Sequence, residues 1–357
     1  DLYLQENKGN FVENGKIKKK LQLKDRTLFR KTRQKILEKQ YLSGIKKSKI
    51  KNMTLKKKYH NWGEGKVSYI EWKGNKPMPG LQFCHATGFN SLTYKKLLEP
   101  LADTFHIRAE DARGHGFTET IADPKAMFDW KVYRDDLIQS VESFVKSKGE
   151  RIILGGHSMG GASVMQVAAA RPDLVAGIIL VEPVLISNMN LKILEVAKKF
   201  PITKSIPFIK ERTSMSDKTL KRRDEFPSRE MMIKSYTGRG AFATWKDGFL
   251  EDYIDGGTKL IKGKIKLTCN PKWEAATFGS WKHNAMNSIK NISCPITLLQ
   301  GETGSTTRNI GVKRLKNKNA LDEFKVIKNS SHFLPMEFPK IIQEEIIKLN
   351  SRIKSIS

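Results

Sequence analysis

One short segment limits the fold of this chain more than any other, Gly156-His157-Ser158-Met159-Gly160. It follows the apolar run 151–154 and precedes a helix of small residues, Ala162–Ala170. Because the glycines lack a Cβ, the chain can reverse sharply here, and Ser158 can adopt a strained conformation with its hydroxyl above a sheet. The helix then points its free N–H groups at that hydroxyl. We predict a strand, a sharp turn and a helix that present Ser158; an ordinary glycine-rich turn is the alternative.

Short apolar runs alternate with helical segments on both sides of this unit. The expected strands are Val67–Trp72, Leu81–Phe83, Phe105–Ala109, Gly177–Val181, Pro295–Leu299 and Phe324–Ile327. The expected helices are Tyr94–Leu101, Lys131–Lys148 and Pro339–Ile353. This alternation predicts an α/β fold with a mostly parallel, doubly wound sheet.

The alternation stops after Pro183 and resumes at Pro295. The segment between them is rich in lysine and helical in pattern, with scattered aromatic residues. We therefore expect a core of residues 59–185 and 294–357 and a helical cap of residues 186–293. Aromatic residues in such an insertion either line a pocket or pack in the cap's own core; the candidates are Tyr236, Phe242, Trp245, Phe249 and Trp273.

The charge of the chain is concentrated near its N-terminus. The formal net charge is +28, and residues 1–58 hold 19 Lys/Arg against 5 Asp/Glu. We expect 1–58 to be a flexible basic extension with a helix around Asp25–Tyr41, although a true start at Met53 is the other reading. Lysine together with abundant Ile and Asn is typical of AT-rich coding sequence. We therefore attribute the excess of lysine first to base composition, and only second to contact of the extension with nucleic acid or an anionic membrane.

Cysteine usage and hydropathy indicate a compartment. Cys84, Cys269 and Cys294 are an odd number at wide spacing, which argues against a disulfide framework or a zinc cage. The sequence has neither the apolar core of a secretory signal nor a run of about 18 apolar residues. A soluble protein of the cytoplasm is expected.

Three further motifs agree with the Ser158 segment. They are His85-Ala-Thr-Gly-Phe89, Asp111-Ala-Arg-Gly-His-Gly116 and Ser331-His-Phe333. With these motifs the chain, from about Lys66 to its C-terminus, resembles the α/β-hydrolase fold family, serine-nucleophile branch. The resemblance implies that Ser158 is the nucleophile, that the loop after His85 helps to bind an oxyanion, and that the Asp111 loop is mainly structural. It also places a cap where the insertion occurs.

A serine hydroxyl needs a base, normally an imidazole, and a carboxylate to orient that imidazole. Of the seven histidines, His332 alone follows the last expected strand. The resemblance implies an acid in a Gly-x-x-Asp sequence, but after Gly301 this chain has glycine at that place, Gly304. We choose Glu182, which ends the strand after the nucleophile; Glu302 or an unidentified acid remain alternatives.

The oxyanion donors expected from the same resemblance are the backbone N–H groups of Met159 and Thr87, with Ala86 as the alternative to Thr87. Phe89 is expected either to line the acyl side of the pocket or to pack in the core.

Two classes of function follow. The first is a cofactor-free serine hydrolase that acts on a small-molecule ester with an apolar acyl group; carbon–carbon bond hydrolases and cofactor-free haloperoxidases with a similar elbow remain open. The second is a catalytically weak protein of this fold that acts by binding. No H-E-x-x-H, carboxylate cluster or dinucleotide fingerprint occurs, so no metal or cofactor is expected. Neither the substrate nor the oligomeric state can be read from the sequence.

Overall fold

The computed structural model describes residues 5–7, 10–13, 16–20, 56–74, 77–199, 207–280, 282–283, 285–307, 309–317 and 321–356. The chain divides into two compact units, Asp1–Thr54 and Leu55–Ser357. In the first unit, β1 (Gln5–Asn7), β2 (Asn10–Glu13) and β3 (Lys16–Lys20) form a small antiparallel sheet. The helix expected around Asp25–Tyr41 lies outside the described residues.

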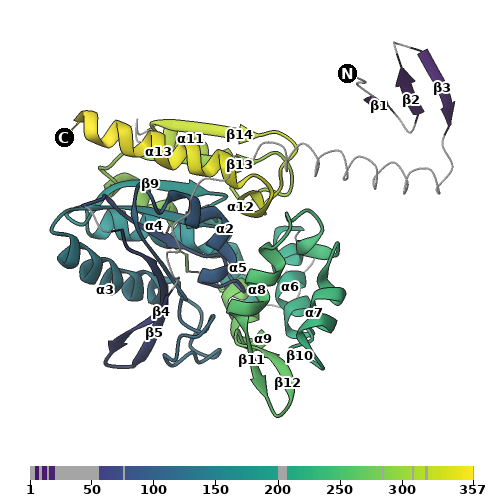
Figure 1. Cartoon of the computed structure of the whole chain (residues 1–357), viewed down its shortest axis with the longest axis horizontal. Coiled ribbons are helices and arrows are strands. Elements are labelled where there is room, and N and C mark those ends of the chain that lie inside the picture. The colour runs from purple at the N-terminus through teal and green to yellow at the C-terminus, as the bar shows by residue number, and fades with distance from the viewer. Residues whose placement is uncertain are drawn as a thin grey trace. The chain divides into compact units, whose positions relative to one another are not determined.

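The second unit is built on an eight-stranded sheet with the order β14-β13-β9-β8-β6-β7-β5-β4 (Figure 1). All neighbours from β14 to β7 pair in parallel, whereas β5 pairs antiparallel with both β7 and β4. The strands are β4 (Lys56–Trp62), β5 (Gly65–Trp72), β6 (Gly80–Cys84), β7 (His106–Glu110), β8 (Ile152–His157), β9 (Val175–Val181), β13 (Ile296–Gly301) and β14 (Glu323–Ile327). The mostly parallel α/β sheet expected from the sequence is therefore present.

Helices cover both faces of this sheet, because its strands are apolar on both sides. Ile152 and Leu154 of β8 belong to the same buried cluster as α3 (Lys131–Lys148) and α4 (Met159–Ala170). Side chains alternate across a strand, so Ile153 points to the other face. There α13 (Pro339–Ile356) lies against β9, β13 and α2 (Lys95–Leu98). Shorter helices complete the unit: η1 (Ser91–Tyr94), η2 (Glu99–Leu101), α11 (Asn309–Asn317) and α12 (Leu334–Glu337).

The segment between β9 and β13 is mostly helical, as the sequence indicated, but it also contains a small antiparallel sheet of order β10-β12-β11. Figure 1 shows most of its helices gathered beside the large sheet, with the β11–β12 hairpin projecting from them. The elements are α5 (Asn188–Lys199), α6 (Pro207–Leu220), β10 (Glu225–Phe226), α7 (Arg229–Tyr236), η4 (Gly240–Phe242), α8 (Phe249–Gly257), β11 (Thr258–Ile261), β12 (Lys264–Leu267), α9 (Pro271–Gly279), α10 (Ala285–Ser288) and η5 (Ile289–Asn291). Met286 and Ile289 join the core cluster of α3 and α4, so the chain returns to the sheet before residue 293.

Candidate active site

Ser158 lies in the sharp turn between β8 and α4. Its backbone has φ 56° and ψ −115°, a conformation that costs a non-glycine residue energy. The turn requires its glycines: a Cβ on Gly156 would lie 2.5 Å from the backbone of Gly160, and one on Gly160 would lie 2.3 Å from the carbonyl oxygen of Cys84. The sequence GHSMG therefore folds as the strand–turn–helix unit predicted from it.

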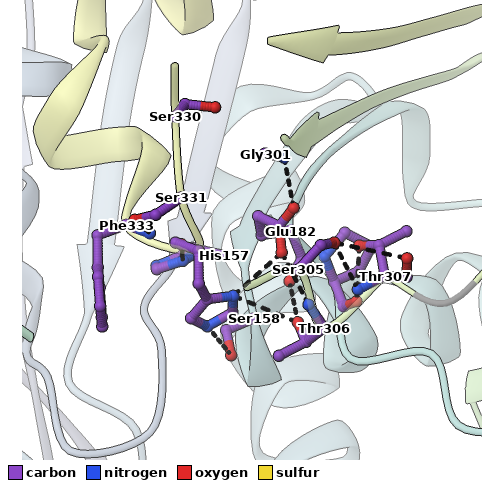
Figure 2. A network of polar contacts seen from close by, with 12 residues as sticks. His157, Ser158, Glu182, Gly301, Ser305, Thr306, Thr307, Ser330, Ser331 and Phe333 are labelled. Atoms are coloured by element: carbon purple, nitrogen blue, oxygen red, sulfur yellow. Dashed lines mark hydrogen bonds and ion pairs between the residues drawn. The ribbon is translucent and has the colours of Figure 1, made fainter. Parts of the chain in front are cut away.

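Glu182 and Ser158 lie near each other at one edge of the sheet (Figure 2), and His332 contacts both of them. The Nε2 atom of His332 lies 3.1 Å from Ser158 Oγ, and its Nδ1 atom lies 3.1 Å from Glu182 Oε2. Because β8, β9 and β13 are parallel neighbours, their carboxyl ends reach this edge together. The three residues chosen from the sequence thus form one continuous line of hydrogen bonds.

Glu182 directly follows β9 and is fully buried. Its Oε1 accepts a hydrogen bond from the Gly301 N–H, and its Oε2 accepts one from the Thr306 N–H at 3.0 Å. These donors stabilise the ionised carboxylate. The alternative acid, Glu302, is exposed and accepts instead from the Asn329 N–H at 2.9 Å.

Thr306 is the site residue that sequence reasoning missed. Its Oγ1 donates to the Glu182 carbonyl oxygen at 2.9 Å and lies 3.3 Å from His332 Nδ1 (Figure 2). It comes two residues after Gly304, which stands where the resemblance implies an aspartate. A threonine in a loop belongs to no motif, so nothing in the sequence marked it. The loop after β13 thus contributes a hydroxyl that contacts both Glu182 and His332.

His157 fixes the loop that carries His332. Burial lowers the pKa of His157 well below its ordinary value of 6.5, so the ring is neutral. Its Nε2–H donates to the His332 carbonyl oxygen at 2.8 Å, and its Nδ1 accepts from the Tyr94 hydroxyl at 2.7 Å. Tyr94 in turn accepts the Ala86 N–H at 3.0 Å. This chain of bonds joins the loop after β6 to the loop after β14.

The same hydrogen bonds distinguish Ala86 from Thr87, the two candidates for the second oxyanion donor. The Ala86 N–H is already donated to Tyr94, whereas the Thr87 N–H has no acceptor among the described residues. Thr87 also touches Met159, since its hydroxyl donates to Met159 Sδ at 3.3 Å. Met159 is the first residue of α4, where a backbone N–H has no partner within the helix.

The Asp111 loop supports this region. The Asp111 carboxylate accepts the N–H groups of Ser91 at 2.8 Å and Phe117 at 3.0 Å, and Arg113 forms an ion pair with Asp136. Both residues hold neighbouring segments of backbone in place, which agrees with the structural role implied by the resemblance.

A cavity of about 990 Å³ opens onto Ser158 and His332. Of the aromatic candidates, Phe89, Tyr236 and Phe242 line it. Trp245 does not; it packs behind the wall, with its ring 5.3 Å from Phe89 and 4.7 Å from Phe242. The two remaining aromatic candidates, Phe249 and Trp273, are buried in packing and do not reach the cavity.

Within the described part of the chain, no group of three His, Cys, Asp or Glu side chains is arranged to hold a metal ion. None of its helices combines the length and apolar character needed to cross a membrane.

With the fold and this geometry in place, comparison with known proteins identifies the family. The model of the alpha/beta hydrolase family matches residues 83–342, and the chain belongs to that family. Monoglyceride lipase of Homo sapiens is 34% identical over 120 residues, which are 33% of this chain and 39% of that protein. The 2-(acetamidomethylene)succinate hydrolase of Mesorhizobium japonicum is 30% identical over 113 residues, 32% of this chain and 38% of that protein.

The sequence matches thus span about two-fifths of these relatives. The fold match is broader: the crystal structure of E-2-(acetamidomethylene)succinate hydrolase superposes with a TM-score of 0.65 and 18% identity, over 83% of this chain and 99% of that one. At this identity the superposition establishes the shared fold alone.

Proposed function

We propose that this protein is a carboxylic-ester hydrolase that forms an acyl-enzyme on Ser158. The observation that carries the proposal is the continuous line from Ser158 Oγ through both ring nitrogens of His332 to Glu182. A hydroxyl bonded to a neutral imidazole, whose other nitrogen is held by a buried carboxylate, is the arrangement that activates serine for acyl transfer. A lipase among the relatives supports an ester substrate.

In the first step, Ser158 Oγ attacks the ester carbonyl carbon while His332 Nε2 takes the hydroxyl proton. Glu182 holds the imidazole in the correct tautomer and stabilises the imidazolium. The N–H groups of Met159 and Thr87 bind the developing oxyanion. His332 then returns the proton to the leaving alcohol, and water, deprotonated by the same imidazole, releases the acid. Residues 186–293 serve as the cap that closes the pocket above Ser158.

A fluorophosphonate probe tests the nucleophile. We expect stoichiometric labelling of Ser158, found by mass spectrometry of the digested protein, and no labelling of Ser158→Ala. A folded protein with an unlabelled Ser158 would instead favour the binding role of a catalytically weak member of this fold.

A substrate panel tests the bond that is cleaved. Aryl and glyceryl esters, lactones and meta-cleavage-type diketones separate ester hydrolysis from carbon–carbon bond hydrolysis, and a halide oxidation assay tests haloperoxidase chemistry. Turnover of the esters alone supports the proposal.

A further inference from the structure

Part of the cavity wall contributed by the inserted segment is polar, next to apolar side chains of the same segment such as Met215 and Phe242. Thr219, Arg222 and Arg223 come from the end of α6 and the loop after it, and Ser235 and Tyr236 come from the end of α7. An apolar acyl chain offers no hydrogen-bond partner to these polar groups. This part of the wall indicates a polar group on the substrate, remote from the bond to be cleaved.

Arg222 does not supply a free charge to this wall. Its guanidinium donates to both carboxylate oxygens of Glu274, at 3.2 and 2.9 Å, and to the hydroxyls of Tyr236 and Tyr253. Glu274 is itself buried, and its carboxylate lies against Gly88, where an added Cβ would be 2.2 Å from Oε1. The pair cancels its own charge and is committed to holding the wall together.

Arg223 differs from its neighbour. Its Nε–H donates to the Glu225 carbonyl oxygen at 2.7 Å, and its guanidinium stacks 4.6 Å from the centre of the Phe226 ring. These contacts fix the plane of the group but use one N–H. Among the described residues no carboxylate pairs with Arg223, so its two terminal nitrogens remain available. The cavity is lined by two arginines, Arg222 and Arg223, and one glutamate, Glu274. Because Arg222 and Glu274 neutralise each other, the remaining positive charge is that of Arg223.

We propose that the cavity selects esters that carry a carboxylate remote from the scissile carbonyl, and that Arg223 binds this carboxylate. The proposal rests on the proposed ester hydrolysis at Ser158. A guanidinium held flat with two free nitrogens matches a carboxylate in two-point geometry, which no other lining side chain offers. The Tyr236 hydroxyl accepts from Arg222 at 3.4 Å, so its own hydrogen is free for a second bond to the same anion.

The kinetic test compares esters of equal length with and without the charge. One arm uses p-nitrophenyl esters of ω-carboxy acids with four to ten carbons against the corresponding neutral alkanoates. The other places the carboxylate on the alcohol, using carboxyphenyl against phenyl butyrate. In one arm we expect kcat/KM to favour the charged ester by 10-fold or more, and Arg223→Gln to lower this ratio by about 10- to 100-fold, as for one charged hydrogen-bonding pair.

Arg239→Gln is the matched control, because Arg239 is an exposed arginine of the same inserted segment that does not line the cavity. We expect it to leave the charged-to-neutral ratio as in the wild type. A wild-type ratio of one or less in both arms, or an equal ratio in the wild type and Arg223→Gln, overturns the proposal.

A binding measurement separates this proposal from the hydrolase function. Calorimetry on Ser158→Ala should detect dicarboxylic acids of the preferred length with affinity that the matched monocarboxylic acids lack, and the double variant Ser158→Ala/Arg223→Gln should lose that difference. If the wild type turns over no ester but this difference is present, the hydrolase function fails and the anion site stands. If esters are turned over and diacids bind no better than monoacids, the anion site fails alone.

Discussion

At the scale of single residues, the proposed acid, Glu182, contacts His332 from another strand than the one that the family resemblance implies. The loop after β13 has Gly304, with φ 61°, where the resemblance implies an aspartate. Glu182 reaches the imidazole from the neighbouring strand instead, and it does so with φ 50°, an unfavourable conformation for a non-glycine residue. Two backbone N–H groups and the Thr306 hydroxyl surround it. The strain and the donors together indicate a position maintained for a role.

Replacing the acid tests this role. Glu182→Gln keeps the volume but removes the charge and can favour the wrong histidine tautomer, so we expect kcat to fall by about 10²- to 10⁴-fold with little change in thermal stability. Glu302→Gln is the matched control, because Glu302 is exposed and its carboxylate accepts from the Asn329 N–H, and its effect should be mild. Loss of activity in Glu302→Gln with retention in Glu182→Gln would assign the acid to the loop after β13.

The nucleophile and the base are expected to act as one unit. Ser158→Ala and His332→Ala should each lower kcat by about 10³-fold or more without unfolding the protein, and the double variant should be little worse than either single variant. Single-turnover kinetics and circular dichroism of the three variants measure this. Losses that multiply in the double variant would show that the two residues act independently.

Thr306 is expected to act as a positioning residue through Glu182 and His332. Thr306→Val keeps the shape and the backbone N–H but removes the hydroxyl, so kcat should fall by about 5- to 20-fold with KM unchanged, as for one lost hydrogen bond. Thr306→Ser restores the hydroxyl and should recover most of the rate. A merely structural role would instead lower the melting temperature of the valine variant and leave kcat per folded molecule as it was.

At the scale of secondary-structure elements, the sequence was most informative where a segment is buried on both sides. The apolar runs of β6, β8, β9 and β13 were predicted within three residues at each end, since a strand inside a parallel sheet must be apolar throughout. β4 was missed because it is an edge strand with a polar, lysine-rich sequence and only an alternating, partly buried pattern. β4, which begins at Lys56, is thus part of the large sheet.

Only part of the candidate site could be predicted from the sequence. Ser158, Glu182 and His332 lie at strand ends or motif positions that the sequence displays. Other contacts of the site join residues that meet only through the tertiary fold. The partners are 124 positions apart for Thr306 and Glu182, 63 for Tyr94 and His157, and 52 for Arg222 and Glu274. Local patterns carry no information about such pairings.

The turn that carries Ser158 offers a test at this scale. Gly160→Ala places a Cβ 2.3 Å from the Cys84 carbonyl oxygen, which is rigid backbone of β6, so the helix or the strand must move. We expect the free energy of unfolding to fall by about 1–3 kcal/mol and activity to fall further, because the same shift moves Met159 and Thr87. Gly63→Ala is the control, since nothing lies within 4 Å of its added Cβ. Equal stability of the two variants in urea denaturation would contradict the tight fit.

At the scale of the whole molecule, four buried or half-buried histidines make the free energy of unfolding depend on pH. Burial lowers the pKa of His60 and His85 to about 4 and that of His115 to about 3, from 6.5, and lowers that of His157 well below 6.5. These rings are neutral in the folded protein, whereas the unfolded chain binds protons below pH 6.5. These histidines therefore do not reduce the free energy of unfolding well above pH 6.5, and they lower it progressively as the pH falls below that value.

Two acids act in the opposite direction. Burial raises the pKa of Glu110 from 4.5 to about 8 and that of Asp252 from 3.8 to about 6, so the folded state binds protons that the unfolded state does not. Between pH 6.5 and 5.5, the three fully buried histidines, His85, His115 and His157, cost about 1 kcal/mol each, and Glu110 returns about 1 kcal/mol. His60 and Asp252 are partly exposed, so solvent screening reduces their two opposing contributions, which roughly cancel. We expect the free energy of unfolding in urea to change little between pH 7.5 and 6.5 and to fall by about 2 kcal/mol at pH 5.5.

Glu110→Gln removes the larger opposing group and should steepen that fall to about 3 kcal/mol. Stability that stays constant or rises from pH 6.5 to 5.5 would mean that these rings are already protonated in the folded protein.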